Sequence, residues 1–405
     1  MWGVRSGTAL KRLRAAADGR AAAGLRRSLI ARSPDFDGMI DLASNDYLGL
    51  RGHPRLAAAA IEAAREWGTG STGSRLVTGT TTLHERLETS LADATGAAET
   101  LVFSSGYLAN LAVITSLTAA LGQHGDGVLI VSDERNHASL IDACRLARGS
   151  GVRLVVAPYR DAMAVRRLLA SRAEESALVV SDAVFSVDGA LAPAGELHAA
   201  ARAHDALLVL DEAHAFGVIG PAGRGVAAAA GIGGEPDVVR TVTLSKSLAG
   251  QGGAVLGAPE VIDTVVDTGR GFIFDTGLAP PSAGAALAAL DVLRGEPGRG
   301  ELALTNARRL AAIAADLGLA VEPPSAAVLA VMLGDPRHAV EAREICASTG
   351  VRVGCFRPPS VPMGQACLRL TTRATMTQRD FVLATRALTK VRDHVGVDVN
   401  PTFKQ

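Results

Sequence analysis

Short apolar runs alternate with amphipathic stretches over residues 97–260, and this alternation gives the first prediction. The stretches 108–121 and 139–148 carry apolar residues at spacings of three and four, which predicts helices. Seven runs rich in Val, Ile and Leu predict strands: 100–103, 128–132, 152–157, 177–182, 206–211, 238–244 and 253–257. Strands and helices that alternate in this way predict an α/β fold with a mostly parallel seven-stranded sheet.

A stretch rich in Gly and charge, 290–301, separates this pattern from a different one. The segments that follow predict a helix (304–318), a strand (326–333), a helix opened by Asp335 and Pro336, two strands (351–356 and 367–371) and a helix from near Thr377, with Asp380 as a weak capping-box variant. We therefore expect an N-terminal helical segment (1–45), a large domain (46–294) and a small C-terminal α+β domain (295–405).

The motif GTGSTG, residues 68–73, matches the glycine pattern G-x-G-x-x-G of dinucleotide-binding loops. That function requires a strand before the loop and a helix after it. The preceding residues 54–67 are instead rich in Ala and begin with Pro54, which predicts a helix. We expect GTGSTG to be a tight connection near the active site and a subunit interface, with a flexible connector as the alternative, and assign it no catalytic residue.

Composition narrows the classes of function. The chain has 405 residues, of which 48% are hydrophobic and only 3% aromatic, and this suits a large α/β enzyme. Basic and acidic residues number 41 each, so we expect no nucleic-acid partner. No run reaches the ~18 apolar residues of a membrane span, and residues 1–30 lack the apolar core of a signal peptide. We interpret this basic N-terminus as a helix of the mature protein, although mitochondrial transit peptides share its composition.

The cysteines form no C-x-x-C pair and no zinc-ligand spacing. They are Cys144, Cys346, Cys355 and Cys367. We expect reduced thiols in a cytoplasmic protein, and no metal site.

Polar residues follow the carboxyl ends of several predicted strands. Open α/β sheets bind their ligands at this edge. Asp211 ends one strand and His214 follows it, while His137 and Lys246 follow two others. Each acid or histidine taken alone is more often a structural group. Lys246 differs because it lies between small residues after a buried strand. Partial desolvation there disfavours the ammonium form and leaves a neutral amine for Schiff-base chemistry.

Pyridoxal 5'-phosphate (PLP) would give these features a common use. It requires a lysine, an acid against its pyridine nitrogen and an anion site. Asp211 can be the acid, and His137 could lie on the face of the ring. The stretch SSGYLAN (104–110), where a strand ends and a helix begins, offers free N–H groups for the phosphate. A serine-capped structural turn explains that stretch equally well.

Six segments together resemble the α-oxoamine synthases, PLP enzymes that condense an amino acid with an acyl thioester and release carbon dioxide. They are LASNDYLGL (42–50), HASLIDA (137–143), VFSVDG (184–189), LDEAHAFGVIGPAGRG (210–225), TLSKSLAGQGG (243–253) and FRPPSVPMG with CLRLT (356–371). The resemblance implies a PLP-dependent transferase of fold type I, active as a homodimer with active sites at the interface. The stretch RPPSVP is most similar to the biotin-pathway member, which joins L-alanine to a pimeloyl thioester.

The resemblance also implies roles for individual residues. Lys246 would bind PLP covalently and move the Cα proton, Asp211 would pair with the pyridine nitrogen, and His137 would stack on the ring beside the substrate. The other cofactor contacts implied are His214 and Ser186 near the ring hydroxyl, Gly106, Tyr107 and Thr243 on the phosphate side, and Thr276 toward the partner's phosphate. The substrate contacts implied are Arg369 for the amino-acid carboxylate, Asn45, Ser360 and Arg26, with Arg20 and Arg27 as register alternatives for Arg26.

Three segments depart from the pattern of the biotin-pathway member. Phe216 in DEAHAFG would stand close to the cofactor wall, Asp182 and Ala183 replace Glu-Gly, and Ser360 replaces Thr. Phe216 leaves the preference for alanine over glycine open. Another α-oxoamine synthase, such as a glycine C-acetyltransferase, is therefore the first alternative, and a non-catalytic PLP-fold subunit is a more distant one. The carrier of the acyl group, coenzyme A or acyl carrier protein, is open as well.

Overall fold

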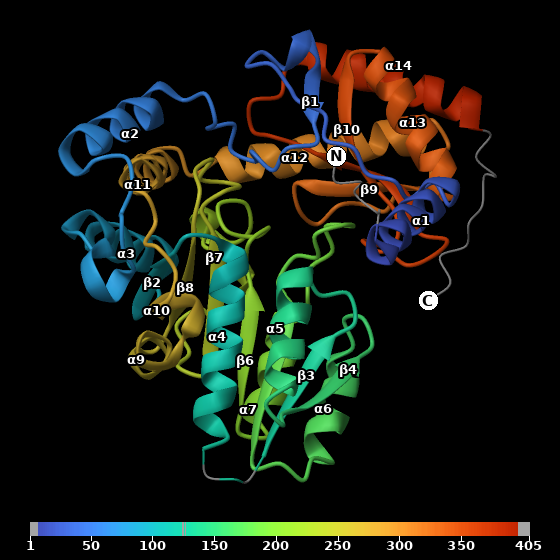
Figure 1. Cartoon of the computed structure of the whole chain (residues 1–405). Coiled ribbons are helices and arrows are strands. Elements are labelled where there is room, and N and C mark those ends of the chain that lie inside the picture. Colours follow the sequence, from blue (N-terminus) through green and yellow to red (C-terminus); the bar gives the residue numbers. More distant parts are fainter. Residues whose placement is uncertain (1–6, 124, 126, 396–405) are drawn as a thin grey trace, which may run out of the picture.

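A seven-stranded sheet forms the centre of the protein (Figure 1). The computed structural model describes residues 7–123, 125 and 127–395, so both outer ends of the predicted N-terminal segment and small domain lie outside the described residues. The strand order is β2 (Glu99–Phe103), β8 (Gly253–Gly257), β7 (Val238–Thr243), β6 (Ala206–Asp211), β5 (Ser176–Asp182), β3 (Val128–Asp133) and β4 (Arg153–Ala157). Only β8 runs antiparallel to its neighbours. The predicted seven strands and their mostly parallel pairing are confirmed.

Both faces of this sheet are buried, which explains why its strands are continuous apolar runs. In β5, Leu178 and Val180 face one core, while Ala177 and Val179 face the other. The first core contains α4 (Gly106–Leu121), α5 (Ala138–Arg148), α9 (Pro259–Thr268) and α10 (Arg270–Ile273). The second contains α6 (Ala162–Ala170), α7 (Ala194–Arg202) and α8 (Val226–Ala229).

A four-stranded sheet organises the C-terminal part of the chain, at the upper right of Figure 1. Its order is β1 (Ile40–Leu42), β10 (Val351–Phe356), β11 (Ala366–Thr371) and β9 (Val328–Gly334). It packs with α12 (Arg299–Asp316), α13 (Pro336–Ser348) and α14 (Gln378–Val395). Asp335 caps α13 as predicted, and Thr377 with Asp380 forms the predicted capping box of α14. The three residues of β1 were not predicted, because a strand this short has no readable periodicity.

The remaining helices lie toward the N-terminus and on one flank of the large sheet. A third apolar cluster joins α2 (Pro54–Trp67), α3 (Thr82–Thr95) and α11 (Pro280–Gly295). Helix α1 (Thr8–Ala22) buries none of its residues. The short turns are Phe36–Gly38, the π-helical Arg75–Gly79 and Pro221–Gly223. No helix in the described ranges is long and apolar enough to cross a lipid bilayer. The three-part division at residues 45 and 294 stays a prediction.

GTGSTG follows helix α2, so the strand that a dinucleotide-binding loop requires is not there. Its backbone is packed tightly. A Cβ added to Gly73 would lie 2.4 Å from Thr78 Oγ1, and the carbonyl of Gly73 accepts a hydrogen bond from the amide of Gly277 at 3.0 Å. Ser71 donates to the carbonyl of Leu278 at 2.6 Å. The loop therefore holds the segment that contains Thr276, as a tight connection would.

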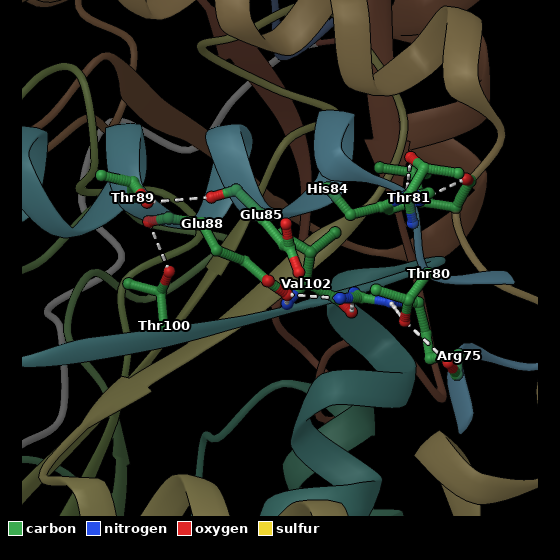
Figure 2. A network of polar contacts seen from close by, with 10 residues as sticks. Arg75, Thr80, Thr81, His84, Glu85, Glu88, Thr89, Thr100 and Val102 are labelled. Atoms are coloured by element: carbon green, nitrogen blue, oxygen red, sulfur yellow. Dashed lines mark hydrogen bonds and ion pairs between the residues drawn. The ribbon is translucent and has the colours of Figure 1, made fainter. Parts of the chain in front are cut away.

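A buried ion pair closes the outer edge of the large sheet (Figure 2). Arg75 Nη2 lies 2.9 Å from Glu88 Oε1, with side chains 6% and 16% exposed. Strand β2 has a neighbour on one side only, which leaves backbone groups unpaired. At Val102 these groups are satisfied, because its amide donates to Glu88 at 2.8 Å and its carbonyl accepts from Arg75 at 3.0 Å. The pair thus fixes the strand that leads into SSGYLAN.

We predict that Arg75→Met lowers the midpoint of thermal unfolding by several degrees. It leaves the Glu88 carboxylate buried without its partner, and breaking a buried pair costs about 3–5 kcal/mol. The matched control is Arg153→Met, because Arg153 is 47% exposed in its pair with Glu174 and such pairs contribute roughly 0–1 kcal/mol. Equal midpoints for the two variants, measured by circular dichroism, would contradict the role given to Arg75.

Candidate active site

The carboxyl ends of the parallel strands bring the predicted polar residues together. Asp182, Asp211 and Thr243 are the last residues of β5, β6 and β7. His137 caps helix α5 just after β3. Residues distant in sequence meet here because parallel neighbouring strands end at the same edge of the sheet.

Lys246 follows β7 and is half-buried. Its Nζ lies 2.7 Å from His214 Nε2. The pKa of Lys246 is lowered from its ordinary value to about 8: burial lowers it most, Asp211 and Asp182 oppose this, and the charge of Arg369 adds to it. A substantial fraction of this amine is therefore neutral near physiological pH, as nucleophilic or basic chemistry requires.

A chain of hydrogen bonds connects Lys246 to Arg369. His214 Nδ1 lies 2.6 Å from Tyr47 Oη, and Tyr47 donates to Asn45 Oδ1 at 3.1 Å. Arg369 Nη1 donates to the same Asn45 oxygen at 3.0 Å. Burial, helped by the charge of Lys246, holds the pKa of His214 well below its usual value. A neutral His214 that accepts at Nε2 and donates from Nδ1 satisfies every group in this chain.

Arg369 is 4% exposed on strand β11. Its Nε donates to the carbonyl of Ser186 at 2.5 Å, and its guanidinium lies 5.4 Å from the ring centre of Phe356. No acidic side chain of the described residues forms an ion pair with it at 4.0 Å or less. A buried cation without an anion is costly, so this position suits a carboxylate supplied by a ligand.

Asp211 is held in one orientation by two donors. Its Oδ1 accepts from the amide of Ala213 at 2.8 Å, and its Oδ2 accepts from Asn110 Nδ2 at 2.7 Å. Asp182 lies beside it in the sheet register. Burial and the charge of Asp211 raise the pKa of Asp182 well above its ordinary value. Two neighbouring carboxyl groups with one raised pKa favour a single negative charge at this position.

His137 is fixed by its place at the start of α5. Its Nδ1 accepts from the amide of Ser139 at 3.2 Å and lies 2.7 Å from Ser139 Oγ. Its own amide donates to Asp182 Oδ2 at 3.0 Å. Burial lowers the pKa of His137, the charge of Asp211 opposes this, and that of Lys246 adds to it. A neutral, oriented imidazole is suited to lie against a flat ring.

The turn before α4 presents bare backbone, as an anion site requires. Ser105 caps the helix by accepting from the amide of Leu108 at 3.2 Å. A Cβ on Gly253 would lie 2.4 Å from the amide nitrogen of Gly106, and one on Gly106 would lie 3.1 Å from Thr243 Cβ. Thr243 donates to the carbonyl of Gly252 at 3.1 Å. This close approach therefore requires glycine at position 253, and a side chain at position 106 would be tightly packed.

Several predicted residues stand apart from this centre. Tyr107 is 43% exposed and donates to Asp142 at 2.6 Å. Thr276 is exposed and bridges to Ser74. Ser186, by contrast, belongs to the centre, because its carbonyl accepts a hydrogen bond from Arg369.

The segment after helix α1, called the N-terminal arm here (residues 23–30), distinguishes between Arg26 and its two alternatives, Arg20 and Arg27. Arg27 Nη2 donates to Ser360 Oγ at 3.1 Å, whereas Arg26 lines a separate cavity. Arg20 lies at the end of α1. Arg27 is thus the one of the three whose side chain bonds to Ser360.

Sequence reasoning missed the roles of Tyr47 and Asn110. Both lie inside quoted motifs, LASNDYLGL and SSGYLAN, but their partners His214 and Asp211 are 167 and 101 residues away. Phe216 packs in the apolar cluster of Leu48 and Leu248, because burial of a large aromatic ring is favourable there, and its expected place close to the cofactor wall stays a prediction.

The residues at this site fit PLP. They include an amine with a lowered pKa, an oriented carboxylate and a helix N-terminus whose glycines leave the backbone open. These are the groups that would bind its aldehyde, its pyridine nitrogen and its phosphate.

The sequence model of the family described as aminotransferase class I and II matches residues 37–388. The chain is 53% identical over 375 residues to the 8-amino-7-oxononanoate synthase of Mycobacterium sp. (strain JLS), which covers 93% of this chain and 94% of the relative. It is 54% identical over 372 residues to the enzyme of the same name from Mycolicibacterium gilvum (strain PYR-GCK), covering 92% and 94%. A solved serine palmitoyltransferase with a PLP internal aldimine is similar at a TM-score of 0.87 and 28% identity, covering 96% of this chain and 99% of that one.

We predict that Lys246 in the cofactor-free protein reacts with trinitrobenzenesulfonate with a midpoint near pH 8, because only the neutral amine attacks the reagent. Asp211→Asn should lower this midpoint, since the Asp211 charge stabilises the ammonium form. Arg369→Met should raise it, since a repelling cation is removed. Peptide mass spectrometry separates Lys246 from the exposed Lys11 and Lys390, which serve as internal controls. A midpoint that moves in the same direction in both variants would contradict this electrostatic balance.

Proposed function

The chain belongs to the aminotransferase class I and II family, and we propose that it condenses L-alanine with a pimeloyl thioester to give 8-amino-7-oxononanoate. The observation that carries this is a single hydrogen-bonded chain with a lysine of lowered pKa at one end and an unpaired, buried Arg369 at the other. The relatives at 53% and 54% identity are 8-amino-7-oxononanoate synthases, and this supports the same product here.

PLP is the cofactor of this enzyme. When bound, it supplies an aldehyde that links covalently to amines and a ring that accepts the electron pair left at Cα. Lys246 would hold the aldehyde carbon, and Asp211 would keep the pyridine nitrogen charged. We assign His137 to the ring face, His214 and Ser186 to the ring hydroxyl, and Gly106, Tyr107 and Thr243 to the phosphate.

Arg369 binds the carboxylate of alanine through charge-assisted hydrogen bonds. Its two contacts, Asn45 and the Ser186 carbonyl, fix the direction of the guanidinium and so orient the Cα–H bond of the substrate. The pairing of charges also removes the cost of an isolated buried cation. Asn45 therefore acts on the substrate through its hydrogen bond with Arg369.

Lys246 Nζ is the base that takes the Cα proton of alanine. Its pKa near 8 means that deprotonation costs little at physiological pH, while the ammonium form is still acidic enough to return the proton. His214 Nε2, at 2.7 Å, accepts a hydrogen bond from this amine and holds it in place. Because the pKa of His214 is strongly depressed, it does not compete for the proton.

The overall reaction balances without an oxidant or a metal. The Cα of alanine forms a bond to the acyl carbon, the carbon–sulfur bond breaks and the carrier leaves as a free thiol. The alanine carboxylate leaves as carbon dioxide, and a proton takes its place at Cα. Ser360, with Arg27 bonded to it, is assigned to the acyl group. Excluding water protects the thioester from hydrolysis.

We further propose a homodimer in which Thr276 reaches the PLP phosphate of the partner subunit. The exposed apolar side chains Leu76, Val77 and Phe274 lie on the two segments that the GTGSTG loop holds together. Three of the cysteines, Cys144, Cys346 and Cys367, are buried free thiols, which suits a reducing cytoplasm.

The purified protein should show the visible absorption of lysine-bound PLP, and Lys246→Ala should lose both this band and activity. Rapid-mixing spectra with alanine, glycine or serine, each with and without pimeloyl-CoA, test the substrate. We expect a thioester-dependent change and released thiol with alanine only. A response confined to glycine with acetyl-CoA, or no PLP band in the wild type, would overturn the proposal.

Arg369→Ala should raise the KM for alanine by roughly tenfold or more, because a hydrogen bond to a charged group contributes about 1.5–3 kcal/mol. The PLP absorption should be unchanged, since Arg369 is assigned to the substrate. Arg373→Ala is the matched control. Arg373 lies four residues further along the chain, is part-buried and forms an ion pair with Asp380. Equal KM values for wild type and Arg369→Ala would contradict the assignment.

A further inference from the structure

The hydroxyl group of Tyr47 lies in the middle of the hydrogen-bonded chain between Arg369 and Lys246. The side chain is fully buried and packs in a core of the large sheet. Its backbone is tied to the small sheet, because its carbonyl accepts from the amide of Ala374, just beyond β11, at 2.8 Å. Its amide donates to the carbonyl of Asn45 at 2.9 Å. These contacts hold the hydroxyl group of Tyr47 at its place in the chain.

The direction of every hydrogen bond in this chain follows from its Arg369 end. A guanidinium group can only donate, so Asn45 Oδ1 accepts from Arg369 Nη1 at 3.0 Å. The same amide oxygen can only accept from Tyr47 Oη, at 3.1 Å, so the tyrosine hydroxyl donates to it. That hydroxyl has one proton, so it must accept from His214 Nδ1 at 2.6 Å. A neutral imidazole with its proton on Nδ1 leaves Nε2 as an acceptor toward Lys246 Nζ.

The two central groups of the chain keep their protons at physiological pH. The pKa of Tyr47 is raised to about 12: burial raises it most, and the charge of Arg369 opposes this. The hydroxyl therefore stays protonated and remains a donor. The pKa of His214 is held well below its usual value, chiefly by burial, so its two ring nitrogens share one proton. The group that faces Nδ1 decides which nitrogen carries it.

We propose that Tyr47 is a positioning residue that fixes the proton of His214 on Nδ1 and so keeps Nε2 as a hydrogen-bond acceptor for Lys246. An acceptor at 2.7 Å stabilises the ammonium form of the lysine. A protonated Nε2 would instead donate to the neutral amine and stabilise that form. Tyr47 thus adjusts the basicity of Lys246 without contacting it. This deepens the proposed function and rests on it only for the use of Lys246 as the base.

Other titratable groups act on Lys246 from four further elements. They are Asp211 at the end of β6, Asp182 at the end of β5, Arg369 on β11 and His137 at the start of α5. Replacing Tyr47 by Phe removes a neutral hydroxyl group and changes none of these charges. A change in the pKa of Lys246 on this replacement therefore reports the state of His214.

The first test is NMR of the cofactor-free protein with ¹⁵N-labelled histidine, because ring nitrogens with and without a proton have well-separated shifts. The His214 signals are those missing from His214→Gln. In the wild type, Nδ1 should carry the proton. Tyr47→Phe leaves this buried N–H without an acceptor, which is costly, so the proton should move to Nε2. The trinitrobenzenesulfonate midpoint of Lys246 should then fall by about one pH unit, since a hydrogen bond to its charged form is lost.

Asn45→Ala provides an independent test with the tyrosine still present. Loss of the Asn45 acceptor releases the proton of the Tyr47 hydroxyl, which can then be donated to His214 Nδ1. The imidazole proton should again move to Nε2, and the midpoint of Lys246 should fall as it does in Tyr47→Phe. If Tyr47 served only to fill space, Asn45→Ala would leave the proton of His214 on Nδ1, and this result would contradict the inference.

The PLP-loaded enzyme gives a third readout. Tyr47→Phe should lower kcat and leave the KM for alanine close to that of the wild type, because the contacts of Arg369 with Asn45 and Ser186 are retained. A raised KM with an unchanged kcat would place Tyr47 among the substrate contacts and contradict its action through His214.

The matched control is Tyr159→Phe, which removes a hydroxyl group that donates to Asp188 at 2.8 Å, outside the chain. It should leave the His214 proton and the Lys246 midpoint unchanged, and circular dichroism reports that each variant is folded. A wild type with the His214 proton on Nε2, or equal midpoints for Tyr47→Phe and Tyr159→Phe, would overturn the inference. If the cofactor-free protein follows the expected pattern but alanine and pimeloyl-CoA give no product, the proposed function fails and the role of Tyr47 stands.

Discussion

The position of one amine, Lys246 Nζ, is the constraint on which the rest of the site depends. Moving a lysine out of water disfavours its charged form, and here burial brings the pKa to about 8. A second cation, Arg369, also lowers this pKa, so charges of the opposite sign are needed to keep the amine basic. Asp211 and Asp182 lie at the ends of adjacent strands of the large sheet, and both raise the pKa of Lys246. The order of the strands thus sets the basicity of the lysine.

The two sheets meet at Arg369, and this contact requires close packing. Arg369 belongs to the small sheet but donates to the carbonyl of Ser186, which follows a strand of the large one. The turn containing Ser186 can lie this close because Gly189 has no side chain. A Cβ there would be 2.3 Å from the carbonyl oxygen of Val328 on β9, and the φ of +73° is itself unfavourable for other residues. Any shift between the sheets would move the guanidinium relative to Lys246.

The sequence predicted those features that are local in the chain. All seven strands of the large sheet were visible because burial on both faces makes each a continuous apolar run, and Lys246 and Asp211 were visible because each follows such a run. Strand β1 was not, since its pairing with β10 joins residues about 310 apart. The bonds of Tyr47 to His214 and of Asn110 to Asp211 depend in the same way on tertiary packing. Arg26 and Arg27 point to different places, a separate cavity and Ser360. The sequence could not show this, because the segment that contains them has no periodic pattern from which the direction of a side chain could be predicted.

The buried arginines of this chain differ in the groups that pair with their guanidinium, and this difference distinguishes structural arginines from those proposed to be functional. Arg75 is buried, but each of its three nitrogens donates within the protein, to Glu88, Thr80 and the Val102 carbonyl, and Glu88 neutralises its charge. Arg240 is also buried, and the opposing charge of Glu212, whose pKa is raised to about 7, compensates it from within the core. Among the described residues, the hydrogen bonds of Arg369 go to neutral acceptors, so its charge would be available to a ligand. Because burying an uncompensated cation is costly, this arrangement supports, independently of any motif, the proposal that Arg369 marks the substrate side of the site.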